Sequence, residues 1–238
     1  MSFEQEVPVT QQTATARLGD LSASWYARVK RALDFLAAGI ALVFAAPIML
    51  LIAAAIRVTL GKPILFRQRR PGLNEKCFEC LKFRSMNDAR DAHGRLLPDE
   101  QRVTRLGAFL RNTSLDELPQ LWNVLRGDLS LIGPRPLLER YLSYYTEAEQ
   151  RRHLVRPGLT GWSQIHGRSC LPFDERLAMD VWYVDHLSWK LDLRILVSTV
   201  WIVLTQRGIS SDLGDALAPL DEQRSKSLAA VQSGQTEN

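Results

Sequence analysis

The pattern of hydrophobic and polar positions is dominated by one apolar run, residues 35–56, which contains no charged side chain. As a helix this run would be about 33 Å long, enough to cross a bilayer core of about 30 Å. Residues 1–24 are polar and slightly acidic, and the run is too long for the core of a secretory signal. We therefore predict a disordered polar lead over residues 1–24 and a membrane helix over residues 25–60.

Pro47 lies near the middle of the apolar run, where it removes a backbone donor and kinks a helix. Basic residues flank both ends of the run, and such residues favour the cytoplasmic side of a membrane. Because both ends favour the same side, we predict a re-entrant segment that bends at Pro47 and returns to the face it entered. A single kinked span with one basic end outside is the alternative. The flanking basic residues are Arg28, Lys30, Arg31, Arg57, Lys62, Arg67, Arg69 and Arg70.

Shorter periodicities predict an α+β fold, with a mostly helical catalytic domain over residues 61–210 and an acidic flexible tail over residues 211–238. Strands at 63–66 and 78–83 are expected to form a small hairpin closed near Arg70-Pro71-Gly72. A short extended piece is expected at 162–166. Helices are predicted over residues 101–111, 115–126, 137–152, 173–187 and 191–206.

The last predicted helix is amphipathic. Its apolar stripe suits either an interfacial helix that rests on a membrane or a helix packed in the core. Trp201 suits the headgroup level of a bilayer. The stripe consists of Leu193, Leu196, Val197, Val200, Trp201 and Leu204.

The formal net charge is +4, and both termini are acidic, so the positive charge is concentrated between residues 25 and 210. Such a body suits an anionic membrane surface and a polyphosphate substrate. The apolar run and the lack of a helix-turn-helix, zinc-finger or RNA-binding signature argue against nucleic acid as a partner. The three cysteines, Cys77, Cys80 and Cys170, are too few for a structural zinc site and are expected to be free thiols.

The strongest candidate for chemistry is the adjacent acidic pair Asp116-Glu117, followed by the rigid basic turn Gly133-Pro134-Arg135-Pro136. One carboxylate can attack a phosphate, its neighbour can hold a divalent cation, and the arginine can accept negative charge. The alternative is structural, because Ser114 and Glu117 have the spacing of a capping box before a helix. The two interpretations are compatible, since a helix N-terminus also favours anions.

A series of short motifs in one order, from Val29 to Ser210, resembles the bacterial sugar transferases. These are monotopic phosphoglycosyl transferases that load a sugar 1-phosphate onto a polyprenol phosphate. With no further membrane spans ahead of the catalytic part, the chain is similar to the small class of this family, typified by the first transferase of bacterial N-glycan assembly. The motifs are Lys30-Arg31 with Asp34-Phe35, Arg70-Pro71-Gly72, Lys82-Phe83-Arg84-Ser85-Met86, Ser114-Leu115-Asp116-Glu117-Leu118-Pro119-Gln120, Asn123-Val124-Leu125-Arg126-Gly127-Asp128, Gly133-Pro134-Arg135-Pro136, Arg156-Pro157-Gly158-Leu159-Thr160-Gly161-Trp162 and Asp180-Val181-Trp182-Tyr183-Val184.

The resemblance implies an enzyme in which Asp116 is the nucleophile that attacks a UDP-sugar and expels UMP. Glu117 would hold Mg²⁺, and the phosphosugar on Asp116 would pass to polyprenol (undecaprenyl) phosphate in a second half-reaction. The site would lie on the cytoplasmic face of the bacterial inner membrane. The product would start assembly of a glycan, O-antigen, capsule or exopolysaccharide, with downstream glycosyltransferases as possible partners.

Several basic residues are candidates for phosphate or nucleotide contact. Arg135 is held between two prolines, which reduces its entropy loss on binding, although it can also be an ordinary surface arginine. Lys82 and Arg84 lie two apart on a predicted strand and are expected to share one face. Arg111 near a helix end is either a site cation or a partner of the helix dipole. The resemblance adds Gln164 and Arg168, in the loop after Trp162, as nucleotide contacts.

The chain departs from close relatives at two places. Ala46-Pro47 stands where relatives often have Ser-Pro, which bears on the sharpness of the bend. His166 and Ser169 stand where asparagine is more frequent, which bears on sugar choice. His166 suits either a general base or a hydrogen-bonded loop histidine. The rival functions are a catalytically silent membrane scaffold for a glycan-assembly pathway and a polyprenol-diphosphate hydrolase.

Overall fold

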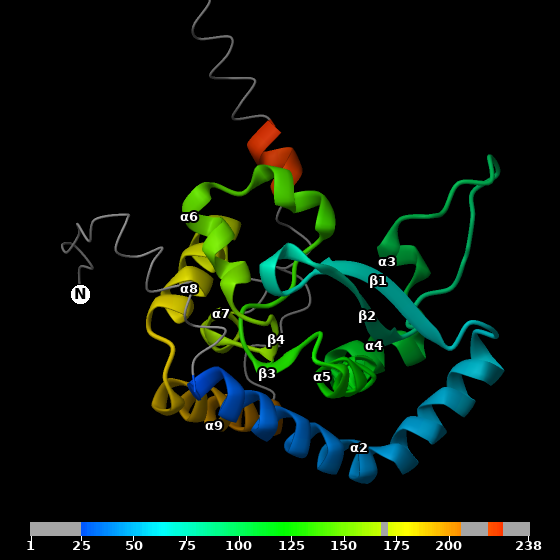
Figure 1. Cartoon of the computed structure of the whole chain (residues 1–238). Coiled ribbons are helices and arrows are strands. Elements are labelled where there is room, and N and C mark those ends of the chain that lie inside the picture. The colour runs from blue at the N-terminus through cyan, green and yellow to red at the C-terminus, as the bar shows by residue number, and fades with distance from the viewer. Residues whose placement is uncertain (1–24, 168–170, 206–218, 226–238) are drawn as a thin grey trace, which may run out of the picture.

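The computed structural model describes residues 25–167, 171–205 and 219–225. The predicted polar lead, Arg168, Ser169 and Cys170, and most of the predicted acidic tail lie outside the described residues. The described part is rich in helices and has two small sheets, which agrees with the predicted α+β class. Helices α2 (Trp25–Thr59) and α9 (Trp189–Thr205) run along the bottom of the domain in Figure 1, and all other elements lie above them.

Helix α2 is 35 residues long and contains Pro47. Its ribbon bends about halfway along (Figure 1). A bend is expected there, because proline removes one hydrogen bond of the helix and its ring crowds the preceding turn. Among the described helices, α2 alone is long and apolar enough to cross a membrane. Its buried residues are only Asp34, Ala38, Ile52 and Ile56.

Two polar side chains tie the first half of α2 to α5 and β3, and Tyr26 and Lys30 also donate to Asp192 of α9. The Asp34 carboxylate accepts hydrogen bonds from Ser130 Oγ at 2.7 Å and from the backbone N–H of Leu131 at 3.1 Å. Arg31 donates to the carbonyl oxygens of Val124 and Leu125 at 2.5 and 2.7 Å. These carbonyls lie in the last turn of α5 (Gln120–Arg126), where helix carbonyls need partners from outside the helix, and that of Val124 also accepts from the N–H of Gly127 at 3.1 Å. The helix is therefore docked, although most of its surface is apolar and exposed.

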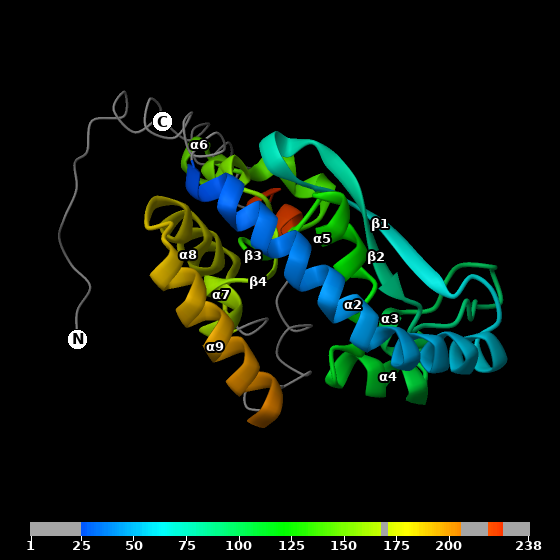
Figure 2. The same cartoon turned by 60° about the horizontal axis from the view of Figure 1, so that its bottom comes forward.

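Helix α9 lies on the same face of the domain as α2 (Figure 2). Its buried residues are Leu191, Asp192 and Ile195. All six residues of the predicted apolar stripe are exposed, so packing of that stripe in the core is wrong. An exposed apolar face of this kind on two neighbouring helices marks an interaction surface.

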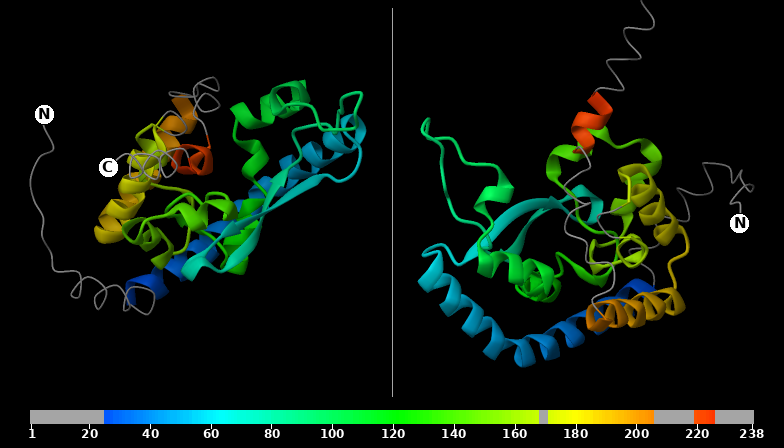
Figure 3. Two further views of the ribbon diagram at one scale, coloured as in Figure 1. Left: turned by 90° about the horizontal axis from the view of Figure 1, so that it is seen from above. Right: turned by 180° about the vertical axis from the view of Figure 1, so that it is seen from behind.

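The predicted hairpin is present, with β1 (Leu65–Pro71) antiparallel to β2 (Cys77–Phe83). The first strand is longer than predicted and includes Arg70 and Pro71, which we had placed in the turn. The turn instead lies at Leu73–Glu75, where Asn74 and Glu75 adopt φ of 51° and 61°. Beyond the hairpin, residues 87–104 project from the end of the domain opposite α8 (Phe173–Asp185), as Figure 3 shows from behind.

A second sheet, which the sequence did not predict, joins β3 (Ser130–Ile132) in parallel to β4 (Gly158–Thr160). Two glycines permit the close approach of these segments. A Cβ on Gly158 would lie 2.1 Å from the backbone nitrogen of Gly133, and one on Gly133 would lie 2.4 Å from the carbonyl oxygen of Arg156. The sheet thereby fixes the start of the Gly133-Pro134-Arg135 turn. Three-residue strands are too short to give a periodic signal.

Several predicted helices are broken into shorter pieces, and the extended piece predicted at 162–166 is wrong, because it forms helix α7. Thr104 caps a new helix start by accepting from the N–H of Gly107, which divides the helix predicted at 101–111. Helices α8 and α9 agree with prediction to within a few residues. The observed elements are α3 (Asp99–Arg102), α4 (Arg105–Asn112), η2 (Leu115–Glu117), α5, η3 (Glu139–Tyr144), α6 (Glu147–Gln150), η4 (Arg151–Leu154), α7 (Trp162–Ile165), α8 and α9.

The capping box predicted at Ser114 and Glu117 is also wrong. Ser114 has a left-handed φ of 57° and its side chain caps no N–H. A single turn of 3₁₀ helix follows, and α5 begins only at Gln120. The Glu117 side chain is therefore free of the helix start and takes other partners.

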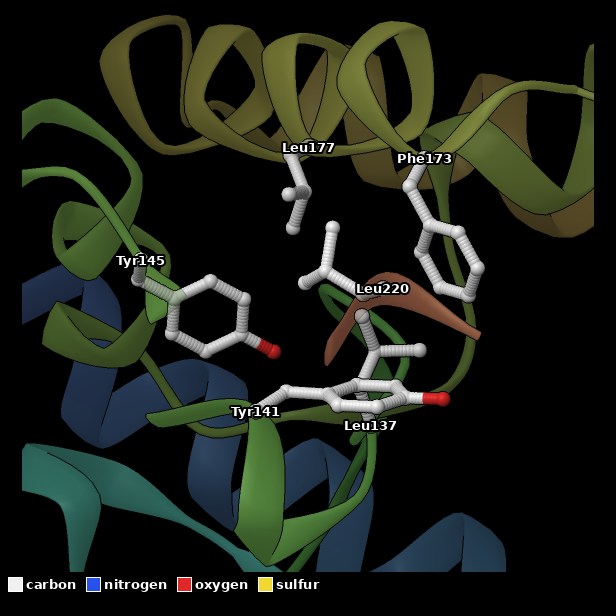
Figure 4. Packing of buried hydrophobic residues seen from close by; sticks show 6 residues of the cluster. All are labelled: Leu137, Tyr141, Tyr145, Phe173, Leu177 and Leu220. Carbon is white, nitrogen blue, oxygen red and sulfur yellow. The ribbon is translucent and has the colours of Figure 1, made fainter. Parts of the chain in front are cut away.

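Residues 219–225, part of the predicted flexible acidic tail, dock on the domain. Leu220 is 1% exposed and lies among Leu137, Tyr141, Phe173 and Leu177 (Figure 4). Arg224 reinforces the contact by donating to Glu149 at 2.6 Å and to Asp174 at 2.7 Å. The acidic character of this segment was visible in the sequence. Its docking was not, because one anchoring leucine gives no periodic hydrophobic pattern.

We predict that Leu220→Ala lowers the free energy of unfolding by about 2–5 kcal/mol, because it leaves a cavity among fully packed side chains. The measurement is denaturant unfolding of the full chain in detergent. Leu204→Ala is the matched control, because Leu204 is 75% exposed. Equal unfolding midpoints for the two variants would contradict the docking of this segment.

Candidate functional site

The acidic pair lies on the single 3₁₀ turn η2, beside strand β2. Asp116 is 7% exposed. Lys82 on β2 points at both carboxylates, with its Nζ 2.7 Å from Glu117 Oε1 and 3.9 Å from Asp116 Oδ2. The left-handed conformation of Ser114 turns the chain between α4 and η2 and so aims the pair at this lysine.

Glu117 is held from two sides. Arg135, in the turn after β3, donates from Nη2 to Glu117 Oε1 at 2.5 Å and from Nη1 to Oε2 at 3.3 Å. Burial by itself would raise the pKa of Glu117, but the charges and hydrogen bonds of Arg135 and Lys82 outweigh it and hold the pKa well below its ordinary value. Glu117 is therefore a fixed anion that also positions both cations.

The pKa of Asp116 is shifted in the opposite direction. Burial raises its pKa, the negative charge of Glu117 adds to the rise, and Lys82, Arg111 and Arg135 counteract it. Among the described residues, Lys82 makes the one ion pair with Asp116, and it is long. Two adjacent carboxylates whose pKa values are shifted in opposite directions are typical of catalytic sites. The less tightly held carboxylate, Asp116, is the one suited to attack.

The structure brings Arg111 to the pair but not Arg84. Arg111 donates to Ser85 Oγ at 3.0 Å, and its charge favours the ionised form of Asp116. The Arg84 guanidinium instead donates to the carbonyls of Leu60, Lys62 and Met86 and to Asp88 at 2.5 Å. Strand β2 ends at Phe83, so Arg84 lies beyond the strand. The rule that side chains two apart on a strand share one face therefore does not apply to Lys82 and Arg84. Arg84 fastens the connection between α2 and β1.

Gln164 lies near the pair, and Arg168 lies outside the described residues. The Gln164 amide donates to the carbonyl of Leu159 at 3.0 Å and borders the same cavity as Glu117 and Arg135. His166 has its Nδ1 2.9 Å from the carbonyl oxygen of Trp162, and its ring contacts the Trp162 ring at a tilt of 50°, as expected of a hydrogen-bonded loop histidine.

Two groups near the site were missed by sequence reasoning. Arg176 on α8 borders the cavity with Arg135. Arg152 and Asp180 form an ion pair at 2.6 Å in which each side chain is 1% exposed, and Arg152 also donates to the carbonyl of Arg135 at 2.6 Å. Arg152 therefore fixes the backbone of Arg135.

The sequence did contain a signal for Arg176. Asp180 belongs to one of the motifs of the resemblance, and Arg176 lies one helical turn before it, so the two residues share a face of the helix.

A cavity of about 440 Å³ opens beside the acidic pair. Its charged lining comes from Glu117, Arg135 and Arg176, and its uncharged polar lining comes from Ser114, Thr160, Ser163, Gln164 and Thr199. The remainder of its wall is mostly apolar and includes residues of α5, β4 and α9. Volumes of about 300–1,000 Å³ with a few convergent polar groups are typical of small-molecule sites.

A magnesium ion fits the donor chemistry here only with substrate present. Among the described residues there is no group of three or more histidine, cysteine or acidic side chains that could hold a metal ion. Magnesium, however, often binds one or two carboxylates and completes its shell with substrate phosphates. Glu117 can serve in this way if it shares the oxygens that now accept from Lys82 and Arg135.

Comparison with known proteins agrees with this arrangement. The family profile described as "Bacterial sugar transferase" matches residues 25–206. The chain is 52% identical over 181 residues to the "Uncharacterized sugar transferase EpsL" of Bacillus subtilis (strain 168), which covers 76% of this chain and 90% of EpsL. It is 40% identical over 196 residues to the "Exopolysaccharide production protein ExoY" of Rhizobium meliloti (strain 1021), covering 75% and 87% of the two chains.

A third relative carries a more specific name. The "UDP-glucose:undecaprenyl-phosphate glucose-1-phosphate transferase" of Xanthomonas campestris pv. campestris is 40% identical over 204 residues, which cover 80% of this chain but only 42% of that enzyme. The chain thus spans most of EpsL and ExoY and less than half of the Xanthomonas enzyme. The profile extends over far more than half of the described residues and the acidic pair, cations and cavity all lie within it, so the chain belongs to the bacterial sugar transferase family.

Proposed function

We propose that the protein is a phosphoglycosyl transferase that moves a sugar 1-phosphate from a UDP-sugar to undecaprenyl phosphate. The observation that carries the proposal is the pair of carboxylates with opposite pKa shifts, surrounded by Lys82, Arg111 and Arg135 beside a cavity. The names of relatives support the substrate classes, since they specify transfer of glucose 1-phosphate or N-acetylgalactosamine phosphate to undecaprenyl phosphate.

In the first half-reaction a carboxylate oxygen of Asp116 forms a bond to the β-phosphorus of the UDP-sugar. The bond from that phosphorus to the bridging oxygen breaks, and UMP leaves with the electron pair. An acyl phosphate that carries the sugar remains on Asp116. A carboxylate is a weak nucleophile, so the surrounding cations must offset negative charge on the phosphoryl group. Lys82, Arg111 and Arg135 are the groups with that charge next to Asp116.

In the second half-reaction a phosphate oxygen of the polyprenol phosphate attacks the same phosphorus. Asp116 leaves as a carboxylate, and the product is a polyprenyl diphosphate sugar. Glu117 keeps Lys82 and Arg135 in place through both steps, because its pKa is held low and it stays ionised. Glu117 would also hold Mg²⁺, which supplies positive charge to the diphosphate.

The proposal places the protein at the cytoplasmic face of the bacterial inner membrane. UDP-sugars are cytoplasmic, and the phosphate of a polyprenol lies at headgroup level. The exposed apolar faces of α2 and α9 lie on one side of the domain and suit a bilayer (Figure 2). A re-entrant α2 and an interfacial α9 would hold Asp116 at the surface where both substrates meet. The product would start assembly of an exopolysaccharide or a related glycan.

We expect Asp116→Asn to abolish turnover and covalent capture, because an amide cannot form the acyl phosphate. Intact mass after mixing with UDP-glucose, UDP-galactose or UDP-N-acetylgalactosamine alone should show the phosphosugar adduct on the parent protein only. An Asp116→Asn protein that still acquires the adduct would exclude Asp116 as the nucleophile. UMP release that continues past one equivalent without polyprenol phosphate would favour a hydrolase, and no release at all would favour a scaffold.

Glu117→Gln is expected to weaken the binding of the Mg²⁺ on which UMP release depends. It also removes the negative charge that holds the side chains of Lys82 and Arg135 in place. The concentration of Mg²⁺ that gives half-maximal rate should rise by roughly tenfold or more, corresponding to about 1.4 kcal/mol. The matched control is Glu79→Gln, which removes an exposed carboxylate on β2, the strand that carries Lys82. An unchanged Mg²⁺ titration would remove Glu117 from the metal site.

A re-entrant α2 predicts that positions 5 and 100 lie on the same side of the membrane. We expect Gln5→Cys and Glu100→Cys, each in a background without the native cysteines, to resist a membrane-impermeant maleimide in sealed cells and to react after permeabilisation. Labelling of position 5 but not position 100 in sealed cells would show that the helix spans. Pro47→Ala should shift the protein toward that labelling pattern, because it restores the missing hydrogen bond and straightens the helix.

A further inference from the structure

The lining of the cavity beside the acidic pair combines charged and aliphatic side chains. Its cations are Arg135 and Arg176, and the charge of Arg135 also favours the ionised form of Asp116. Its aliphatic side chains, which we call the apolar end, come from five elements, α5, β3, β4, α7 and α9, and from the residue that follows η2. These are Leu118, Leu121, Leu131, Leu159, Ile165, Leu196, Ile202 and Val203. A site with cations and an apolar end is complementary to an amphiphile with a phosphate head.

Helix α9 supplies one wall of the apolar end. Leu196, Thr199 and Ile202 recur at intervals of three, so they share one side of the helix, and Val203 lies beside them. Thr199 Oγ1 lies 2.8 Å from Thr160 Oγ1 on β4, which holds this side of α9 against the sheet. Val197, Val200 and Trp201 are exposed and do not border the cavity.

The apolar wall continues to the outside of the molecule. Leu196 and Val203 border the cavity, and they are 42% and 48% exposed. They therefore join the cavity to the exposed apolar face of α9, with no charged residue of α9 between Leu196 and its last residue, Thr205. A cavity of about 440 Å³ is too small for a whole undecaprenyl chain, so a long tail must leave across this edge.

We infer that the apolar half of this cavity binds the first isoprene units of the polyprenol phosphate and that α9 is the wall over which the chain passes to the bilayer. The inference rests on the proposed function and adds the place of the acceptor chain to it. The phosphate of the acceptor lies at Arg135 and Arg176, within reach of the phosphosugar on Asp116. Burial of the chain against α9 supplies binding energy in proportion to the apolar area covered. The acceptor is therefore recognised by its chain as well as by its phosphate.

The competing occupant of the apolar half is the nucleotide of the UDP-sugar. The two half-reactions distinguish these ligands, because the nucleotide acts only in the first and the prenyl chain only in the second. Ile202→Trp fills the apolar half, and Ile202→Ser removes apolar contact without adding volume. Leu96→Trp is the matched control, because it adds the same ring to an exposed residue of the projecting segment 87–104, outside the cavity and outside α9.

Two rates are measured for each full-length variant in detergent. The first is UMP release without acceptor, using whichever of UDP-glucose, UDP-galactose and UDP-N-acetylgalactosamine the parent protein accepts. The second is transfer to undecaprenyl phosphate and to a ten-carbon prenyl phosphate. We expect both Ile202 variants to raise the KM for undecaprenyl phosphate at least tenfold, with a smaller effect on the ten-carbon acceptor. Leu96→Trp should leave both rates within about twofold of the parent.

The inference is overturned if the Ile202 variants slow UMP release as much as transfer, which would assign the cavity to the nucleotide. It is also overturned if Ile202→Trp, Ile202→Ser and Leu96→Trp give the same KM for undecaprenyl phosphate. A misfolded Ile202→Trp is recognised by its thermal melt, and Ile202→Ser then decides the outcome. Failure of the proposed function would look different, because the parent protein itself would then transfer phosphosugar to neither acceptor.

Discussion

The double ion pair of Glu117 with Lys82 and Arg135 is the interaction on which the site depends. Each partner comes from a different part of the fold: Lys82 from the antiparallel hairpin, Glu117 from the turn before α5, and Arg135 from the turn after β3. Removing one member of a buried ion pair leaves an uncompensated charge that is costly to keep. The contact therefore joins three segments that share no continuous element, and it leaves Asp116 beside the two cations with only a long ion pair of 3.9 Å to Lys82.

A second layer of polar contacts supports this arrangement from behind. Arg152, buried and paired with Asp180, fixes the carbonyl of Arg135, and Ser163 donates to the same Asp180 at 2.8 Å. The side chains of a site are positioned well only when the groups behind them are also fixed. Helices α7 and α8 thus contribute to the geometry at Asp116 although neither one carries the acidic pair.

The sequence predicted the residues proposed to carry out the chemistry better than it predicted the residues that hold them in position. The apolar run, the hairpin, α8 and α9 followed from periodicity, and the acidic pair with Arg135 followed from residue type and order. Arg84 was misjudged because the strand ends one residue earlier than its alternation suggested, and Ser114 was misjudged because a left-handed residue leaves no periodic trace. The parallel pairing of β3 with β4 and the buried Arg152 pair arise from contacts distant in the chain, which a local pattern cannot reveal.

The attachment of Asp34 to β3 couples helix α2 to the candidate site. Asp34 accepts from Ser130 and Leu131, and Arg135 follows that strand by only three residues. Under the proposed function, the depth at which α2 rests in a bilayer would therefore set the height of Arg135 above the lipid tails. A thicker or thinner bilayer would then raise or lower the proposed reaction centre relative to the headgroups at which the acceptor phosphate lies.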